Sequence, residues 1–228
     1  MKVAVAGDLP SKNVEPVSLA CDPKTGTFVA GVPVGGSGIH VAASRDRGAT
    51  WKLMQVPGGE EQVTATAIAL DGEVVHLAWP HEGPGVEYRM GALGDGPSKW
   101  KKMTSPEIAG WKSPNPTNVG LVLDGSGKPM VVYYSEQEEG TGRRFLAWRP
   151  GSAPAVAFES KATTDFPNLA LTFGAGRFGL LVSNPVNPEK SHFSMTNGAA
   201  WSKPSVIPPD GPRTTNQPED IAIDSGDA

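Results

Sequence analysis

Short apolar segments separated by Gly, Pro and Asp are the main pattern along this chain. They read VSLACDPKTG, TAIALDGE, VGLVLDGSGK, NLALTFGAGR and DIAIDSGDA, and each leads into a turn. The matching turn positions are Asp22, Asp71, Asp124, Phe173 and Asp224, so the segment recurs at intervals of 49, 53, 49 and 51 residues. Segments of this length and composition are typical of antiparallel strands. A period near 50 residues predicts a repeat architecture.

Three more strand-like segments follow each of the first four turns. The first repeat continues with TFVAGVP, IHVAAS and WKLMQVP, and the later repeats follow the same order. Four strands in about 50 residues describe one β-propeller blade. We therefore expect an all-β fold in which the whole chain, 1–228, is a single β-propeller with complete blades at about 16–58, 64–105, 117–160 and 166–208. A β-sandwich would give no reason for the same turn to return at a fixed period.

The two ends carry single strands of further blades. Residues 2–7 align with 52–57, the fourth strand of a blade, and 219–228 repeat only a first strand. Either residues 1–8 and 219–228 join into a closing blade, or the chain is an excerpt of a larger propeller. We favour the excerpt, because an open edge at the C-terminal strand would invite pairing with another chain. A native mass well above 23.8 kDa would support it.

Composition excludes several classes of protein. The 28 Gly and 22 Pro fit a chain that turns often, and six Trp provide material for a core. A net charge of -4 with scattered Lys and Arg argues against nucleic acid as a partner, and no apolar run approaches the length of a membrane span. Cys21 has no partner for an intrachain disulfide, and its apolar neighbours predict that it is buried.

The segment SRDRGATW, residues 44–51, lies between the third and fourth strands of the first repeat. Its pattern resembles the Asp-box, or BNR repeat, of sialidase-like β-propellers. The Asp carboxylate can accept N–H groups of its own turn, Gly tolerates positive φ, and Trp can bury its ring. Degenerate copies end at Trp100 and Trp201, so we interpret the motif as a structural turn. The structural residues are Ser44, Asp46, Gly48, Thr50, Trp51, Asp95, Gly96, Trp100, Ser194, Gly198 and Trp201.

The resemblance carries further expectations. It implies six or seven blades in a full propeller, an extracytoplasmic location and a ligand face on the rim opposite the Asp-boxes. For the turn itself, Asp46→Ala and Trp51→Ala should lower stability, the latter by roughly 3 to 5 kcal/mol if the ring is buried.

Candidate binding residues lie in the predicted loops of the opposite rim. They are Trp111, His81, Tyr88, Arg144, Asn187 and Arg213. The Phe/Tyr-Arg-Ile-Pro motif of sialidases is absent, so we identify no catalytic set. His40, His76, His81 and His192 lack metal-ligand spacing, and we expect no metal or cofactor.

These observations favour a non-catalytic binding propeller that recognises a glycan or a protein through its loop rim. One alternative is a fragment of a sialidase-like glycoside hydrolase. The other is an assembly module that completes a blade with a partner chain.

Overall fold

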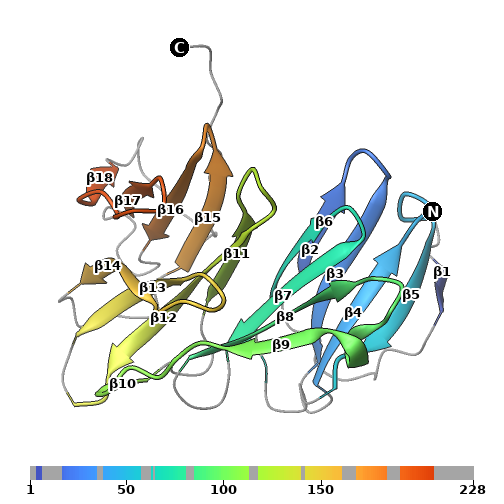
Figure 1. The fold of residues 1–228 in the computed structure, drawn as a ribbon, viewed down its shortest axis with the longest axis horizontal. Coiled ribbons are helices and arrows are strands. Elements are labelled where there is room, and N and C mark those ends of the chain that lie inside the picture. Colours follow the sequence, from blue (N-terminus) through green and yellow to red (C-terminus); the bar gives the residue numbers. More distant parts are fainter. Residues whose placement is uncertain are drawn as a thin grey trace, which may run out of the picture.

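The predicted all-β fold with four four-stranded blades is confirmed (Figure 1). The computed structural model describes residues 4–6, 17–34, 38–57, 63, 65–80, 85–112, 118–139, 142–160, 168–183 and 191–207. Within these ranges the one helix is a 3-10 turn, η1 (Pro97–Lys99), and no helix has the length and apolar character needed to cross a membrane.

Each blade is an antiparallel meander of four sequential strands. Blade 1 contains β2 (Ser18–Asp22), β3 (Thr27–Val34), β4 (Gly38–Ser44) and β5 (Thr50–Gln55). Blade 2 contains β6 (Ala67–Asp71), β7 (Val74–Pro80), β8 (Val86–Ala92) and β9 (Lys101–Thr104). Blade 3 contains β11 (Val119–Leu123), β12 (Pro129–Gln137), β13 (Arg143–Trp148) and β14 (Ala155–Ser160). Blade 4 contains β15 (Asn168–Gly174), β16 (Arg177–Ser183), β17 (Ser191–Thr196) and β18 (Ser205–Ile207).

Two short strands add to these sheets. Strand β1 (Ala4–Ala6) pairs in parallel with β5, Ala4 opposite Thr50, and so forms a fifth, outer strand of blade 1. This differs from the sequence-based prediction, in which the match of residues 2–7 with 52–57 makes the segment the fourth strand of a separate blade. Residues 219–228 lie outside the described residues, and a closing or partial blade therefore stays a prediction.

The core consists of three layers between successive blades. The first strands of the blades, β2, β6, β11 and β15, are neighbours in that order. Separate apolar clusters fill the spaces between blades 1 and 2, blades 2 and 3, and blades 3 and 4. Each middle blade is thus packed against a neighbour on both faces, which explains why its second strand, β7 or β12, is largely apolar on both faces.

Strand β12 shows this two-sided burial residue by residue. Val131 and Tyr133 pack in the cluster shared with blade 2, whereas Val132 and Tyr134 pack in the cluster shared with blade 4. Side chains alternate between the faces of a strand, so neighbouring residues enter different clusters. The two tyrosines are packing residues.

Cys21 is exposed, which corrects the expectation that it is buried. It lies on β2, the innermost strand of blade 1. Ser18 and Ala20 on this strand face blade 2, because the Ser18 hydroxyl is 2.9 Å from the Thr66 hydroxyl and Ala20 packs in the apolar cluster between blades 1 and 2. Cys21 and Leu19 point to the other face, where Leu19 is 62% exposed. Alternation along the strand therefore outweighs the apolar composition of its neighbours.

The turn at 44–51 is held by its own side chains. The Ser44 hydroxyl donates to Asp46 Oδ1 at 2.7 Å and accepts from the Gly48 N–H at 2.8 Å. Thr50 donates to the same carboxylate from its hydroxyl at 2.6 Å and its N–H at 2.8 Å. These hydrogen bonds, the one from the Thr50 hydroxyl first, lower the pKa of Asp46 to about 2. The segment is thus a self-contained polar turn.

The copy at 194–201 keeps the turn but loses part of this network. Thr196 stands where the first copy has Asp46, and its hydroxyl accepts from the Gly198 N–H at 2.9 Å. The buried Ser194 hydroxyl finds no hydrogen-bond partner within the described part of the chain. The two serines are equally buried, at 2% and 1% exposure, and differ in their hydrogen bonds.

This difference predicts opposite effects of one substitution. Ser44→Ala should lower the free energy of unfolding by about 1 to 2 kcal/mol, because it removes two short hydrogen bonds and a longer one, from the Asp46 N–H, at a buried position. Ser194→Ala removes an unsatisfied hydroxyl and should be neutral or slightly stabilising. Urea unfolding of the two variants beside the wild type measures both. Equal losses would contradict the assignment of the network to Ser44.

Candidate functional site

Strand β10 (Trp111–Lys112) builds one part of the rim opposite the 44–51 turn. It belongs to the connection from blade 2 to blade 3, and it pairs with the end of β12, Trp111 opposite Gln137. The connection is fixed at two further points, because the Glu138 N–H donates to the Gly110 carbonyl at 3.0 Å and the Trp111 N–H to that of Ile108 at 3.0 Å. In Figure 1 this strand lies at the lower edge of blade 3.

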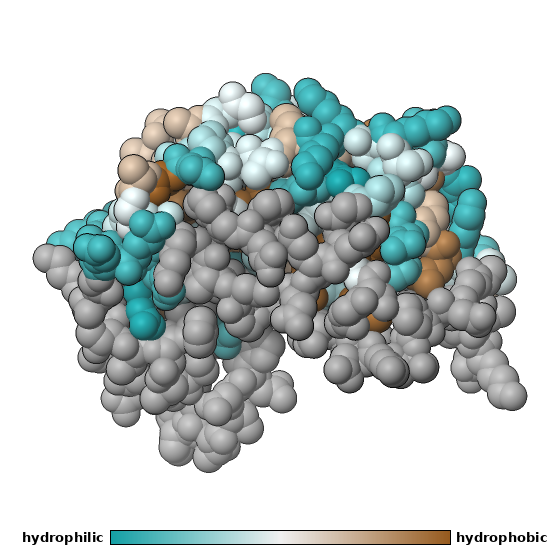
Figure 2. All heavy atoms as spheres, turned by 90° about the horizontal axis from the view of Figure 1, so that it is seen from below, coloured by the Kyte–Doolittle hydropathy of each residue, from teal (hydrophilic) through white to brown (hydrophobic). Residues whose placement is uncertain are grey.

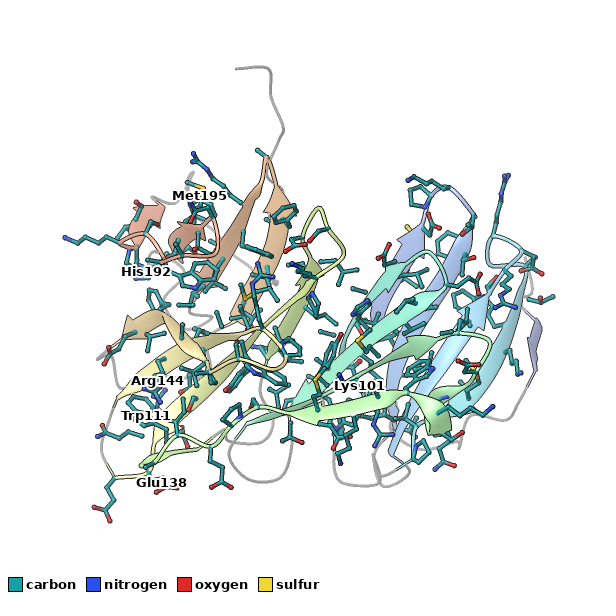
Figure 3. The ribbon with its side chains drawn as sticks, in the orientation of Figure 1. Lys101, Trp111, Glu138, Arg144, His192 and Met195 are labelled. Atoms are coloured by element: carbon teal, nitrogen blue, oxygen red, sulfur yellow. The ribbon has the colours of Figure 1, made fainter. Side chains whose placement is uncertain are left out.

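Trp111 and Arg144 come together on this rim (Figure 3). The Arg144 guanidinium carbon lies 3.5 Å from the centroid of the Trp111 ring, a close cation–π contact. Arg144 extends from β13, where it is opposite Ser135 on one side and Glu159 on the other. Burial lowers the pKa of its guanidinium group. The stack therefore joins the connection to the third blade.

A small pocket lies beside the stack. It has a volume of about 10 Å³, room for about one water molecule, and is lined by Gly85, Pro106, Ile108, Trp111, Tyr133, Ser135 and Leu146. A hydrogen bond links Tyr133 to the side chain of Ser105, whose hydroxyl also accepts from the Val86 N–H at 2.9 Å. Gly85 has φ +118°, and a Cβ there would lie 2.3 Å from the Ser105 hydroxyl oxygen. Blades 2 and 3 thus both supply the lining.

The surface around this rim is mixed. Seen from below (Figure 2), the described residues show hydrophilic side chains with separate hydrophobic patches rather than one continuous apolar face. Glu136 and Glu138 lie opposite or beside the residues of β10. This composition suits a polar ligand better than an apolar one.

Of the six binding residues predicted from sequence, the structure brings Trp111 and Arg144 together. Tyr88 is corrected: it is fully buried between blades 2 and 3, where its hydroxyl is 2.6 Å from His76 Nδ1 and its ring meets that of Trp148 edge-on. Burial raises the pKa of Tyr88, and its ring cannot reach a ligand on the rim. His81, Asn187 and Arg213 lie outside the described residues.

A buried charge cluster between blades 1 and 2 was not predicted from the sequence. Glu87 is completely buried, and its Oε1 accepts from Arg89 Nε at 2.9 Å. The Lys102 ammonium lies 2.6 Å from Oε2, an ion pair without hydrogen-bond geometry. Arg89 also lies over the ring of Trp79, 5.5 Å from its centroid. The signal in the sequence was the i, i+2 spacing of Glu87 and Arg89, which puts both on one face of β8.

Across the described ranges, no group of three or more His, Cys, Asp or Glu side chains is arranged to hold a metal ion. Acidic side chains near the rim include Glu136, Glu138 and Glu159, and the last of these is exposed on β14.

Comparison with known proteins gives structural matches alone. No protein-family model matches the chain, and no curated protein matches it. The exo-beta-1,3-galactanase of Phanerochaete chrysosporium, solved with galactose, has a TM-score of 0.53 at 11% identity, over 84% of this chain and 49% of its own. The endo-arabinase of Bacteroides thetaiotaomicron VPI-5482 has a TM-score of 0.54 at 14% identity, over 88% of this chain and 83% of its own.

A third match is the catalytic domain of the GH62 alpha-L-arabinofuranosidase of Coprinopsis cinerea. Its TM-score is 0.52 at 10% identity, over 87% of this chain and 70% of that domain. This chain spans about half the length of the galactanase. Together with the four blades and the order of their inner strands, these matches define the class: the chain is a β-propeller. At such low identity the likeness concerns the fold.

Proposed function

We propose that this β-propeller binds a carbohydrate at the rim where β10 meets the β12–β13 hairpin. The observation that carries the proposal is the Trp111–Arg144 stack beside the pocket lined by Tyr133 and Ser135. An aromatic ring with adjacent hydrogen-bonding groups suits a sugar, which has apolar C–H faces and a polar edge. The small pocket would accommodate a single protruding group, with the rest of the sugar lying along the rim.

The fold comparisons support a carbohydrate as the ligand. The similar structures bear the names of a galactanase, an endo-arabinase and an arabinofuranosidase. They suggest galactose- and arabinose-containing oligosaccharides as the first probes. This rim is polar enough for such ligands, since Ser135, Glu136 and Glu138 lie next to β10.

The test is a calorimetric titration of the full chain with galacto- and arabino-oligosaccharides. Trp111→Ala should lower the affinity at least about tenfold, because it removes the stacking surface. Trp201→Ala is the matched control, since Trp201 is a half-buried tryptophan packed between blades 3 and 4 near the opposite rim. If Trp111→Ala bound these sugars as tightly as the wild type, the carbohydrate would not bind at this rim and the proposal would be wrong.

A glycoside hydrolase is the second candidate, favoured by the names of the similar structures. The turn at 44–51 resembles the Asp-box and makes a sialidase-like propeller the more specific hypothesis, although the sialidase arginine motif is absent from the sequence. Aryl arabinofuranosides, galactosides and a sialoside form the assay set. Turnover that a substitution within this chain abolishes would contradict a purely binding role.

A further inference from the structure

Arg144 has two hydrogen-bond donors that the rest of the site leaves unused. Its Nε and Nη2 atoms are buried and have no hydrogen-bond partner among the residues that the structure describes. These two nitrogens form one edge of the guanidinium plane, the edge that binds two oxygens of an anion side by side. The contrast with Arg89 is direct, because Arg89 uses its Nε and Nη2 on Glu87, each at 2.9 Å.

An unpaired edge of this kind is costly for the free protein. A buried charged donor without an acceptor loses its hydration and gains nothing in return. The carboxylate across the strand pair, Glu159, is exposed, and it affects Arg144 through longer-range attraction, with no hydrogen bond between them. The stack on Trp111 covers a face of the guanidinium group, while the edge donors find no acceptor in the part of the chain that the structure describes.

We infer that this edge of Arg144 receives an oxyanion carried by a sugar, so that the ligand is an acidic rather than a neutral carbohydrate. The inference rests on the proposed carbohydrate-binding function and specifies its ligand. Two coplanar oxygens, from a uronic acid carboxylate or a sulfate ester, would satisfy both donors at once. The ligand must displace the atoms that cover the two nitrogens, and the sugar ring would then lie beside Trp111.

The experiment compares charged ligands with neutral analogues. Trigalacturonic acid is titrated beside its full methyl ester, and sulfated galactobiose beside galactobiose, into the full chain. Arg144→Met keeps the stem that packs on Trp111 and removes the donors, whereas Arg144→Lys keeps the charge without the paired edge. Arg143→Met, the neighbouring arginine on β13, is the matched control for the loss of one charge. Urea unfolding of each variant checks that it folds.

The expected result is binding of a charged ligand and at least tenfold weaker binding of its neutral analogue. Arg144→Met should lower the affinity for the charged ligand roughly 10- to 100-fold, and Arg144→Lys should retain part of that affinity. Arg143→Met should bind the charged ligand as tightly as the wild type. Preference for trigalacturonic acid assigns a carboxylate, and preference for sulfated galactobiose assigns a sulfate. Equal binding of charged and neutral ligands, unchanged in Arg144→Met, would overturn the inference and leave the proposed function intact. No binding of any of these sugars, nor of those titrated above, would overturn both.

Discussion

Replacing Glu87 with glutamine is expected to lower the free energy of unfolding by about 3 kcal/mol. The carboxylate is completely buried and faces two cations, Arg89 and Lys102. Removing one partner of a buried ion pair leaves the other charge without compensation, which is far more costly than losing a surface pair. Arg89 is 7% exposed and cannot regain its hydration without separating blades 1 and 2. Urea unfolding at neutral pH gives the value from the midpoint and slope.

The matched control for this prediction is Glu73→Gln. Glu73 pairs with Arg45 across blades 1 and 2, but the side chains are 51% and 58% exposed. Such a pair contributes about 0 to 1 kcal/mol, so the control should change stability little. A double variant, Glu87→Gln with Arg89→Met, should recover part of the loss because the buried cation is gone. Similar small losses in Glu87→Gln and Glu73→Gln would show that the cluster is hydrated and not buried.

The second large effect is expected at Trp100. Trp100→Ala should lower the free energy of unfolding by about 4 kcal/mol, because the ring is 5% exposed and lies in the cluster between blades 1 and 2. Its Nε1 also donates to the Ala92 carbonyl at 3.0 Å. The ring fits closely over Gly91, where a Cβ would lie 2.3 Å from Trp100 Cδ1. Thermal or urea unfolding of the variant measures the loss.

Trp51 should behave differently, although it ends the better-preserved copy of the same turn. Its ring is only half-buried, against Ala30, Val32 and Val34, so Trp51→Ala should cost about 1 to 2 kcal/mol. This revises the 3 to 5 kcal/mol expected for a buried ring. Trp→Phe at each position should cost about 1 kcal/mol, since it removes one indole hydrogen bond and keeps most of the ring. An equal loss of stability in the two Trp→Ala variants would show that the turn, and not the packing between blades, determines how much each tryptophan contributes to the free energy of unfolding.

The candidate site could be predicted from sequence only in part. Trp111 and Arg144 were candidates because both lie in or beside loops of the predicted rim, and the rim follows from the strand order. Their direct contact depends on β10 pairing with β12, which joins residues 24 and 26 positions apart and has no local signature. Tyr88 was misplaced for the same reason: its position in a strand is local, whereas its burial requires Trp148 from the next blade.

The sequence by itself determined the blades, because strands and turns depend on neighbours within a few residues. Strands follow from alternating apolar side chains, and the turns follow from residues such as Asp46, which supplies a hydrogen-bond acceptor, and Gly48, which adopts a positive φ. Only the tertiary structure decided which of these residues are buried and which lie free on a rim. Trp51 and Trp100 end related turns, yet the second is enclosed by a neighbouring blade and the first is not. Burial is set by what packs on each face of a blade, and that comes from distant parts of the chain.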